Sequence, residues 1–87
     1  ERTANPVATK VTLLLLAEGA ERTVEHLVRE RAVRVARMRE LTAARQRPGT
    51  TFQEVLAADH ALAHLDADLR WIDSARRRIH DLEGEIA

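Results

Sequence analysis

The sequence predicts an all-α protein: one short helix followed by a long antiparallel helical hairpin, assembling as a helical homodimer. The first observation is the stretch from Phe52 to Leu82, whose 31 residues contain neither Gly nor Pro and repeat apolar side chains about every 3.5 residues. The second is composition, because 45% of the residues are apolar while Phe52 and Trp71 are the only aromatic ones. A core of Ala, Leu, Val and Ile favours helix packing over a β-sandwich or barrel. We expect one domain, residues 1–87, with one modest core.

The first helix is expected over residues 6–17. Asn5 suits the N-cap, Pro6 the first helical position, and Gly19 the residue that follows the last turn. One face of this helix consists of Val7, Val11, Leu14 and Leu15. Leu13 and Leu16 lie off that face, so the helix is apolar all round and should be buried on more than one side. We expect the second side to face another subunit or a preceding domain.

The second helix is expected over residues 20–46. Glu21 near its start and Arg45 near its end each complement the charge of the helix dipole at that terminus. Arg31 falls within the apolar stripe, where its stem can lie on the core while its guanidinium stays in water. The stripe comprises Val24, Leu27, Val28, Val35, Met38 and Leu41.

The third helix is expected over residues 52–82 and has a well-marked start. Pro48 and Gly49 break the chain, and Thr51 with Glu54 forms a capping box ahead of an apolar run. Arg76 interrupts the apolar seam, and Gly84 should fray the C-terminal tail. The core seam comprises Leu62, Leu65, Leu69, Ile72 and Ile79.

Charge divides the chain into two complementary halves. Residues 21–47 hold eight Arg and four Glu, a balance of +4, while residues 51–87 hold four Arg and eight acidic residues, a balance of −4. We therefore expect the basic helix to lie beside the acidic one. The alternative is that the Arg-rich half binds nucleic acid, but its Arg residues are interleaved with Glu. Four i,i+4 pairs should add local support: Glu25–Arg29, Glu30–Arg34, Asp66–Arg70 and Asp73–Arg77.

The residues that could carry chemistry do not form a catalytic pattern. There is no Cys, which excludes disulfides and thiolate chemistry, and there is no Gly-rich phosphate loop. His60 and His64 have the spacing of metal ligands on one helix face, with Asp68 one turn further on, but the Glu of a zinc-protease motif is missing. We expect no enzyme, no bound metal and no cofactor. His26 and His80 are expected on the surface.

Trp71 is the most unusual residue of the third helix, because it lies off the leucine seam. Two interpretations are open: a core Trp between the second and third helices, or a Trp at a subunit interface or in the wall of an effector pocket, where Trp is enriched. On the second interpretation, the dimer or effector contacts are Trp71, His64, Ala67, Ala75 and Leu82.

Two stretches carry a resemblance to a known family. The segment His60 to Asp73, HALAHLDADLRWID, resembles the last long helix of PadR-family transcriptional regulators with a virulence-activator-like C-terminal domain. The segments KVTLLLL (10–16) and VEHLVRER (24–31) are similar to the short apolar helix and the following helix of that domain. The resemblance covers nearly the whole chain, and its motifs are a Trp, a Leu pattern and helix lengths.

The resemblance implies a C-terminal dimerisation and effector-sensing domain of a bacterial transcriptional regulator. It implies homodimerisation through these helices, a small aromatic effector, and DNA contact only through an N-terminal winged-helix domain that is missing from this sequence. The alternative is a stand-alone helical interaction module, such as an antitoxin or adaptor. No segment has the roughly 20 consecutive apolar residues of a membrane span, and no signal sequence is recognised, so we expect a cytoplasmic protein without membrane contact.

Overall fold

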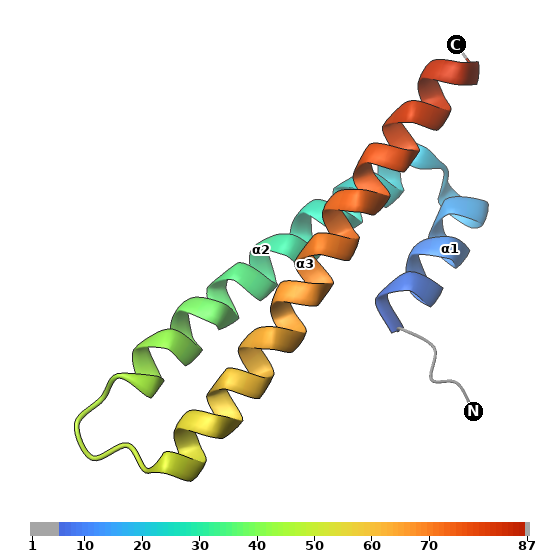
Figure 1. Ribbon diagram of the computed structural model, residues 1–87. Helices are drawn as coiled ribbons and strands as arrows, with labels where there is room; N and C mark the ends of the chain where they lie inside the picture. The colour runs from blue at the N-terminus through green and yellow to red at the C-terminus, as the bar shows by residue number, and fades with distance from the viewer. Residues whose placement is uncertain (1–5, 87) are drawn as a thin grey trace.

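The computed structural model contains three helices (Figure 1) and describes residues 6–86, except for the side chains of residues 6, 8 and 83–86. The helices are α1 (Pro6–Glu18), α2 (Ala20–Arg45) and α3 (Phe52–Ile86). Residues 6–86 include no strand, so the all-α prediction is confirmed. The predicted start of each helix agrees with the structure. The predicted end of the third helix is wrong, because α3 continues through Gly84, where we expected fraying.

Local signals account for the two breaks between helices. Gly19 has φ of 90°, a left-handed conformation that Gly adopts without steric cost, and it separates α1 from α2. The hydroxyl of Thr23, which is fully buried, donates a hydrogen bond of 2.7 Å to the Gly19 carbonyl. At the start of α3, the Glu54 amide donates to Thr51 Oγ1 at 3.1 Å and the Thr51 amide donates to Glu54 Oε1 at 2.8 Å. These two reciprocal bonds confirm the predicted capping box.

Three ion pairs join α2 to α3, which lie side by side and run in opposite directions (Figure 1). Arg31 Nε lies 3.1 Å from Asp73 Oδ1, and Arg34 Nε lies 3.1 Å from Asp68 Oδ2. The third pair, Arg45 with Asp59, lies nearest the connecting turn. Arg31 and Arg45 are as far apart in the sequence as Asp59 and Asp73. The two outer ion pairs are therefore compatible with a single antiparallel register of α2 against α3. The predicted placement of the basic helix beside the acidic one is confirmed.

The four predicted i,i+4 pairs divide into two that form and two that do not. Arg34 lies 2.5 Å from Glu30, and Arg70 lies 2.8 Å from Asp66. Asp73 turns across to Arg31 rather than along its own helix, because the partner helix supplies a guanidinium within reach. The predicted ion pair between Asp73 and Arg77 is therefore wrong. Among the described side chains, the predicted pair between Glu25 and Arg29 is also not formed. These two predictions came from sequence spacing alone, and spacing does not show whether a neighbouring helix offers a competing partner.

The core lies where all three helices meet. Its buried members are Val11 from α1, Leu27 from α2, and Ile72 and Ile79 from α3; Val7, Ala20, Val24, Trp71 and Ala75 pack against them. His26 is also buried, with 8% of its surface exposed, so its predicted surface position is wrong. The reason is that α1 packs on α2, so the first helix covers positions that an isolated α2 would expose.

Away from this core the seam is only half-buried. Leu62, Leu65 and Leu69 of α3 are half-buried, whereas Ile72 and Ile79 are buried. On α2, Val28 is 46% exposed, so its place in the buried stripe is a wrong prediction. The remaining stripe residues beyond Leu27, which are Val35, Met38 and Leu41, are half-buried. A contact between only two helices is exposed to solvent along both of its edges. The arm formed by α2 and α3 therefore leaves its apolar seam partly exposed.

The molecule is elongated, with principal extents of 55 × 30 × 18 Å and a Cα radius of gyration of 16.2 Å. A compact domain of this length has a radius of gyration of about 12 Å. The accessible surface is 6466 Å², whereas a compact monomer of this mass exposes about 5,200 Å². The chain therefore exposes surface that a compact fold would cover. None of the helices in residues 6–86 is long and apolar enough to cross a membrane.

Candidate functional site

The structure divides the five predicted contact residues into two groups. Trp71 and Ala75 are half-buried and pack against the chain's own core. His64, Ala67 and Leu82 are exposed. Trp71 thus packs where α1 joins the other two helices, a setting closer to the core interpretation than to a free surface. The distal part of the predicted surface, around His64, remains open.

A groove of mixed lining lies between α2 and α3 near the connecting turn. It has a volume of about 520 Å³, and its wall combines small apolar residues with three arginines, Thr50 and Glu54. The groove-lining apolar residues are Leu41, Ala44, Ala57, Ala58 and Ala61. Ala57, Ala61 and His64 follow one another at spacings of four and three, so they share one face of α3. We call this combined surface, Leu41, Ala44, Ala57, Ala61 and His64, the open face.

His60 and His64 contact each other edge to face, with ring centroids 5.0 Å apart and an interplanar angle of 76°. Both side chains are exposed. Among the described residues, no group of three or more His, Cys, Asp or Glu side chains is arranged to hold a metal ion. The pair therefore presents two polar rings at the edge of the open face.

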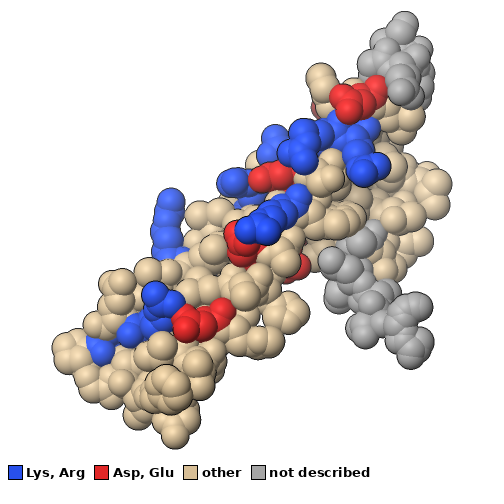
Figure 2. All heavy atoms as spheres, viewed as in Figure 1, with Lys and Arg blue, Asp and Glu red and all other residues tan. Residues whose placement is uncertain are grey.

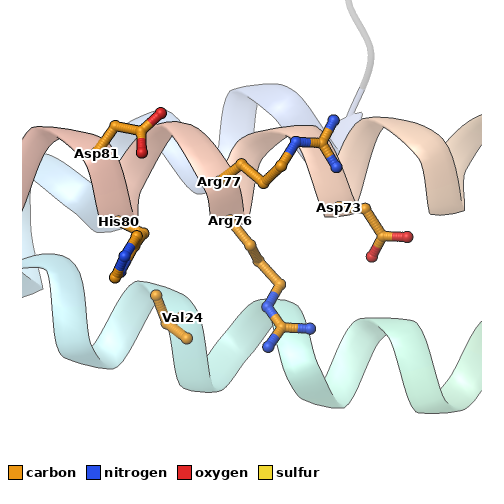
Figure 3. Close-up of a pocket in the computed structure, with 6 residues that line it drawn as sticks. All are labelled: Val24, Asp73, Arg76, Arg77, His80 and Asp81. Carbon is orange, nitrogen blue, oxygen red and sulfur yellow. The ribbon is translucent and has the colours of Figure 1, made fainter.

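A second hollow, of about 650 Å³, lies over α2 and the C-terminal part of α3. Figure 3 shows Arg76 extending from α3 across α2, and His80 lying above Val24 of α2. Arg77 and Asp81 stand on the other edge of α3 (Figure 3). The hollow was not predicted from the sequence, although Arg76, which lines it, interrupts the apolar seam.

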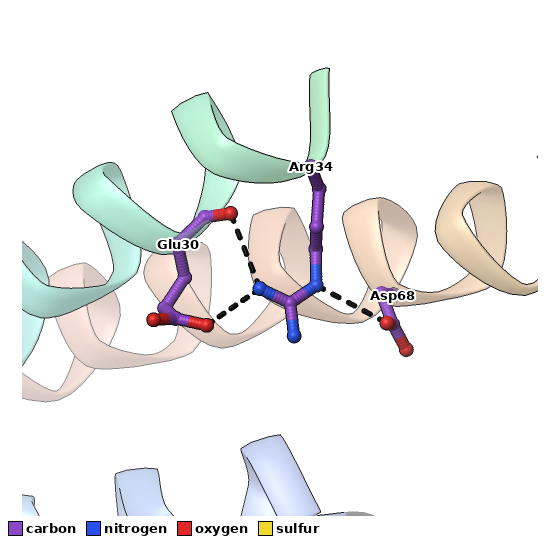
Figure 4. Close-up of polar contacts among 3 residues, drawn as sticks. All are labelled: Glu30, Arg34 and Asp68. Atoms are coloured by element: carbon purple, nitrogen blue, oxygen red, sulfur yellow. Dashed lines mark hydrogen bonds and ion pairs between the residues drawn. The ribbon is translucent and has the colours of Figure 1, made fainter. Parts of the chain in front are cut away.

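The most connected polar contact lies between the two hollows, where Arg34 bridges both long helices (Figure 4). Its Nη1 donates to Glu30 Oε1 at 2.5 Å and to the Glu30 carbonyl at 3.2 Å, while its Nε donates to Asp68 Oδ2 at 3.1 Å. The Arg34 side chain is only 15% exposed. The hydrogen bond from Arg34 is the main cause that holds the pKa of Glu30 below its ordinary value of 4.5, outweighing the opposing effect of burial. Sequence analysis recognised the i,i+4 half of this contact and missed the bond to Asp68.

Charges of both signs are interleaved over the visible face of the molecule (Figure 2). The formal net charge of the chain is zero. A phosphate-binding surface for nucleic acid requires a basic patch that continues over several elements, and the basic side chains of α2 are engaged with acidic partners of α3 at three places.

Comparison with protein-family models, curated proteins and solved structures finds no match to this chain.

Proposed function

We propose that these residues form a homodimerisation and effector-sensing domain, of the kind that the PadR resemblance implies for the C-terminal part of a transcriptional regulator. In this proposal the helices supply the subunit contact and the effector site. DNA is contacted by a winged-helix domain and not by the helices themselves. The observation that supports dimerisation most strongly is the large apolar surface that the single chain leaves uncovered.

The excess accessible surface is as large as the area that a dimer interface covers. The total accessible surface, polar and apolar together, exceeds that of a compact monomer by about 1,300 Å², and a stable interface of standard size buries about 800 Å² on each partner. Seven large apolar side chains are exposed among the described residues: Leu13, Leu16, Val28, Val33, Phe52, Leu56 and Leu82. A two-fold partner is the commonest way to cover such a surface.

We place the subunit contact at the open face, because the seam beside it is only half-buried in the single chain, although the seven exposed side chains lie outside this face. Ala44, Ala57 and Ala61 let a neighbouring helix approach closely, because their side chains end at Cβ. A second α2–α3 arm laid on the groove would convert a two-helix contact into a four-helix one. Such a layer would also cover the half-buried seam leucines that the single chain leaves partly in water.

The second candidate function is a stand-alone interaction module that binds a different protein through α1. Leu13 is 63% exposed and Leu16 is 81% exposed, although α1 packs on α2 through its other side. Two exposed leucines three residues apart form one apolar edge, as in helices that dock into a partner's groove. This candidate predicts that substitutions in α1, and not in the open face, abolish the functional association.

Ala61→Glu tests the dimer proposal, with Ala63→Glu as its matched control. Ala61 lines the groove, whereas Ala63 is exposed and sits two residues on, about 200° around the helix. The glutamate side chain would fill the space that a neighbouring helix needs, and desolvating its charge at a subunit contact adds a further cost. We therefore expect Ala61→Glu to raise the dimer dissociation constant by about 100-fold or more, and Ala63→Glu to change it by less than about threefold.

Sedimentation equilibrium measures both dissociation constants, and circular dichroism checks that the helix content is kept. Ala57→Glu provides a second groove variant, since Ala57 is exposed in the single chain and lines the same groove. If both groove variants dimerise as tightly as Ala63→Glu, the open face is not the interface. If a Leu16→Ser variant alone loses association, the α1 module is the better explanation.

A further inference from the structure

Arg76 occupies a position that the helix pattern assigns to an apolar side chain. It lies four residues after Ile72 and three before Ile79, both of which are buried, so the three residues share the face that packs on α2. Arg76 is itself half-buried. A charged side chain at such a site loses hydration and is normally compensated by an opposite charge.

No described side chain supplies that compensation. The other arginines between α2 and α3, which are Arg31, Arg34 and Arg45, each pair with an aspartate of α3. Arg76 has no ion pair or hydrogen bond with any described side chain, and the nearby Asp73 is engaged by Arg31. Arg76 is thus the one inter-helix arginine in residues 6–82 without a partner.

The unpartnered guanidinium faces space rather than protein. It lines the hollow of about 650 Å³ together with Val24, His80 and Asp73, whose carboxylate is held by Arg31, and it extends across α2 (Figure 3). A guanidinium offers two parallel N–H donors to a carboxylate or phosphate, the imidazole of His80 offers a further donor, and Val24 gives an apolar wall. Arg77 and Asp81 at the rim carry opposite charges.

We infer that this hollow binds a small organic anion, with Arg76 holding a carboxylate or phosphate oxygen and Val24 contacting the apolar body of the ligand. The inference deepens the proposed effector-sensing function and rests on it for its biological meaning. Because Asp73 and Asp81 also line the hollow, a singly charged carboxylate fits better than a doubly charged phosphate monoester. The ligand would supply the negative charge that no described side chain provides to Arg76.

The test is a titration of the ¹⁵N-labelled chain with benzoate, benzamide and phenyl phosphate, followed by NMR. Benzoate and benzamide share their ring and differ in charge, and phenyl phosphate distinguishes the two oxyanion sources. We expect benzoate to shift the amide signals around Arg76, His80 and Val24 with saturation in the millimolar range typical of fragments. Benzamide should bind about tenfold more weakly or not at all, because it lacks the charge that Arg76 would pair with. Phenyl phosphate should fall between them.

Arg76→Leu and Arg78→Leu provide the matched variants. Each removes one positive charge from α3, but Arg78 is exposed and does not line the hollow. Arg76→Leu should weaken benzoate binding by about tenfold or more while raising the melting temperature, since a leucine continues the apolar seam. Arg78→Leu should change binding by less than about twofold.

Equal shifts with benzoate and benzamide, equal losses in the two variants, or shifts that map away from the hollow would each overturn the inference. A melting temperature that falls in Arg76→Leu would show a structural role for this arginine instead. The oligomeric state, measured without ligand, is a separate readout. A dimer that binds no benzoate refutes only the anion site, whereas a monomer that binds it refutes only the dimer.

Discussion

Ile72→Ala is expected to destabilise the chain by about 3–5 kcal/mol, the upper part of the range for deleting a large buried aliphatic side chain. Ile72 is 0% exposed and belongs to the core cluster of the described residues, together with Val11, Leu27 and Ile79. These neighbours come from all three helices, so little can collapse into the space that the alanine leaves. Urea denaturation at fixed protein concentration measures the loss, since association would otherwise change the apparent stability.

Leu69→Ala is the informative companion variant. Leu69 belongs to the same seam but is only half-buried, so its loss should be roughly half that of Ile72→Ala under the same conditions. The comparison tests where the core lies along α3. At protein concentrations where the chain is monomeric, a loss at Leu69 that equals or exceeds the loss at Ile72 would place the core nearer the turn and contradict the three-helix packing described above.

Arg34→Ala is expected to cost about 2–3 kcal/mol, because it removes charged hydrogen bonds and leaves the Glu30 and Asp68 carboxylates without their shared partner. The matched control is Arg37→Ala, one turn along α2. Arg37 pairs with Glu40, but both side chains are more than half exposed, so the control should cost less than about 0.5 kcal/mol. Equal losses in the two variants would show that Arg34 is no more than a surface charge.

The pH dependence of stability gives this contact a second readout. The folded chain holds the pKa of Glu30 below 4.5, so the unfolded chain takes up a proton first as the pH falls. The stabilisation from Glu30 is therefore complete above pH 4.5 and is lost as the pH falls through the lower folded pKa. In Arg34→Ala that part of the acid-induced loss should disappear, while Arg37→Ala should keep it. If Arg34→Ala lost as much stability at low pH as the unmodified chain, the hydrogen bond from Arg34 would not be the cause of the lowered pKa of Glu30.

Sequence signals that act within a few residues predicted the helices well. Gly19 and the capping box of Thr51 with Glu54 mark breaks whose chemistry is local, and the structure contains both. The complementary charges of the two long helices also led to a correct expectation, because their arginines and aspartates recur at matching intervals.

The sequence was least informative about side chains whose burial depends on packing with α1. His26 looked like a surface residue because nothing in the periodicity of α2 shows that α1 will lie on it. Trp71 left two interpretations open because it lies off the seam, and the sequence of α3 alone does not show that it packs against the core that α1 helps to form. The same limit applies to Arg76, whose unusual position was visible in the sequence while the hollow beside it was not.

The proposed dimer rests on the mismatch between an elongated shape and the need to cover apolar surface, and the molar mass in solution tests it most directly. Sedimentation equilibrium of the unmodified chain from about 1 to about 100 µM covers the range in which micromolar association becomes visible. We predict a mass that approaches twice the 9.8 kDa of the single chain as the concentration rises. A mass that stays at 9.8 kDa at the highest concentration would contradict the proposal.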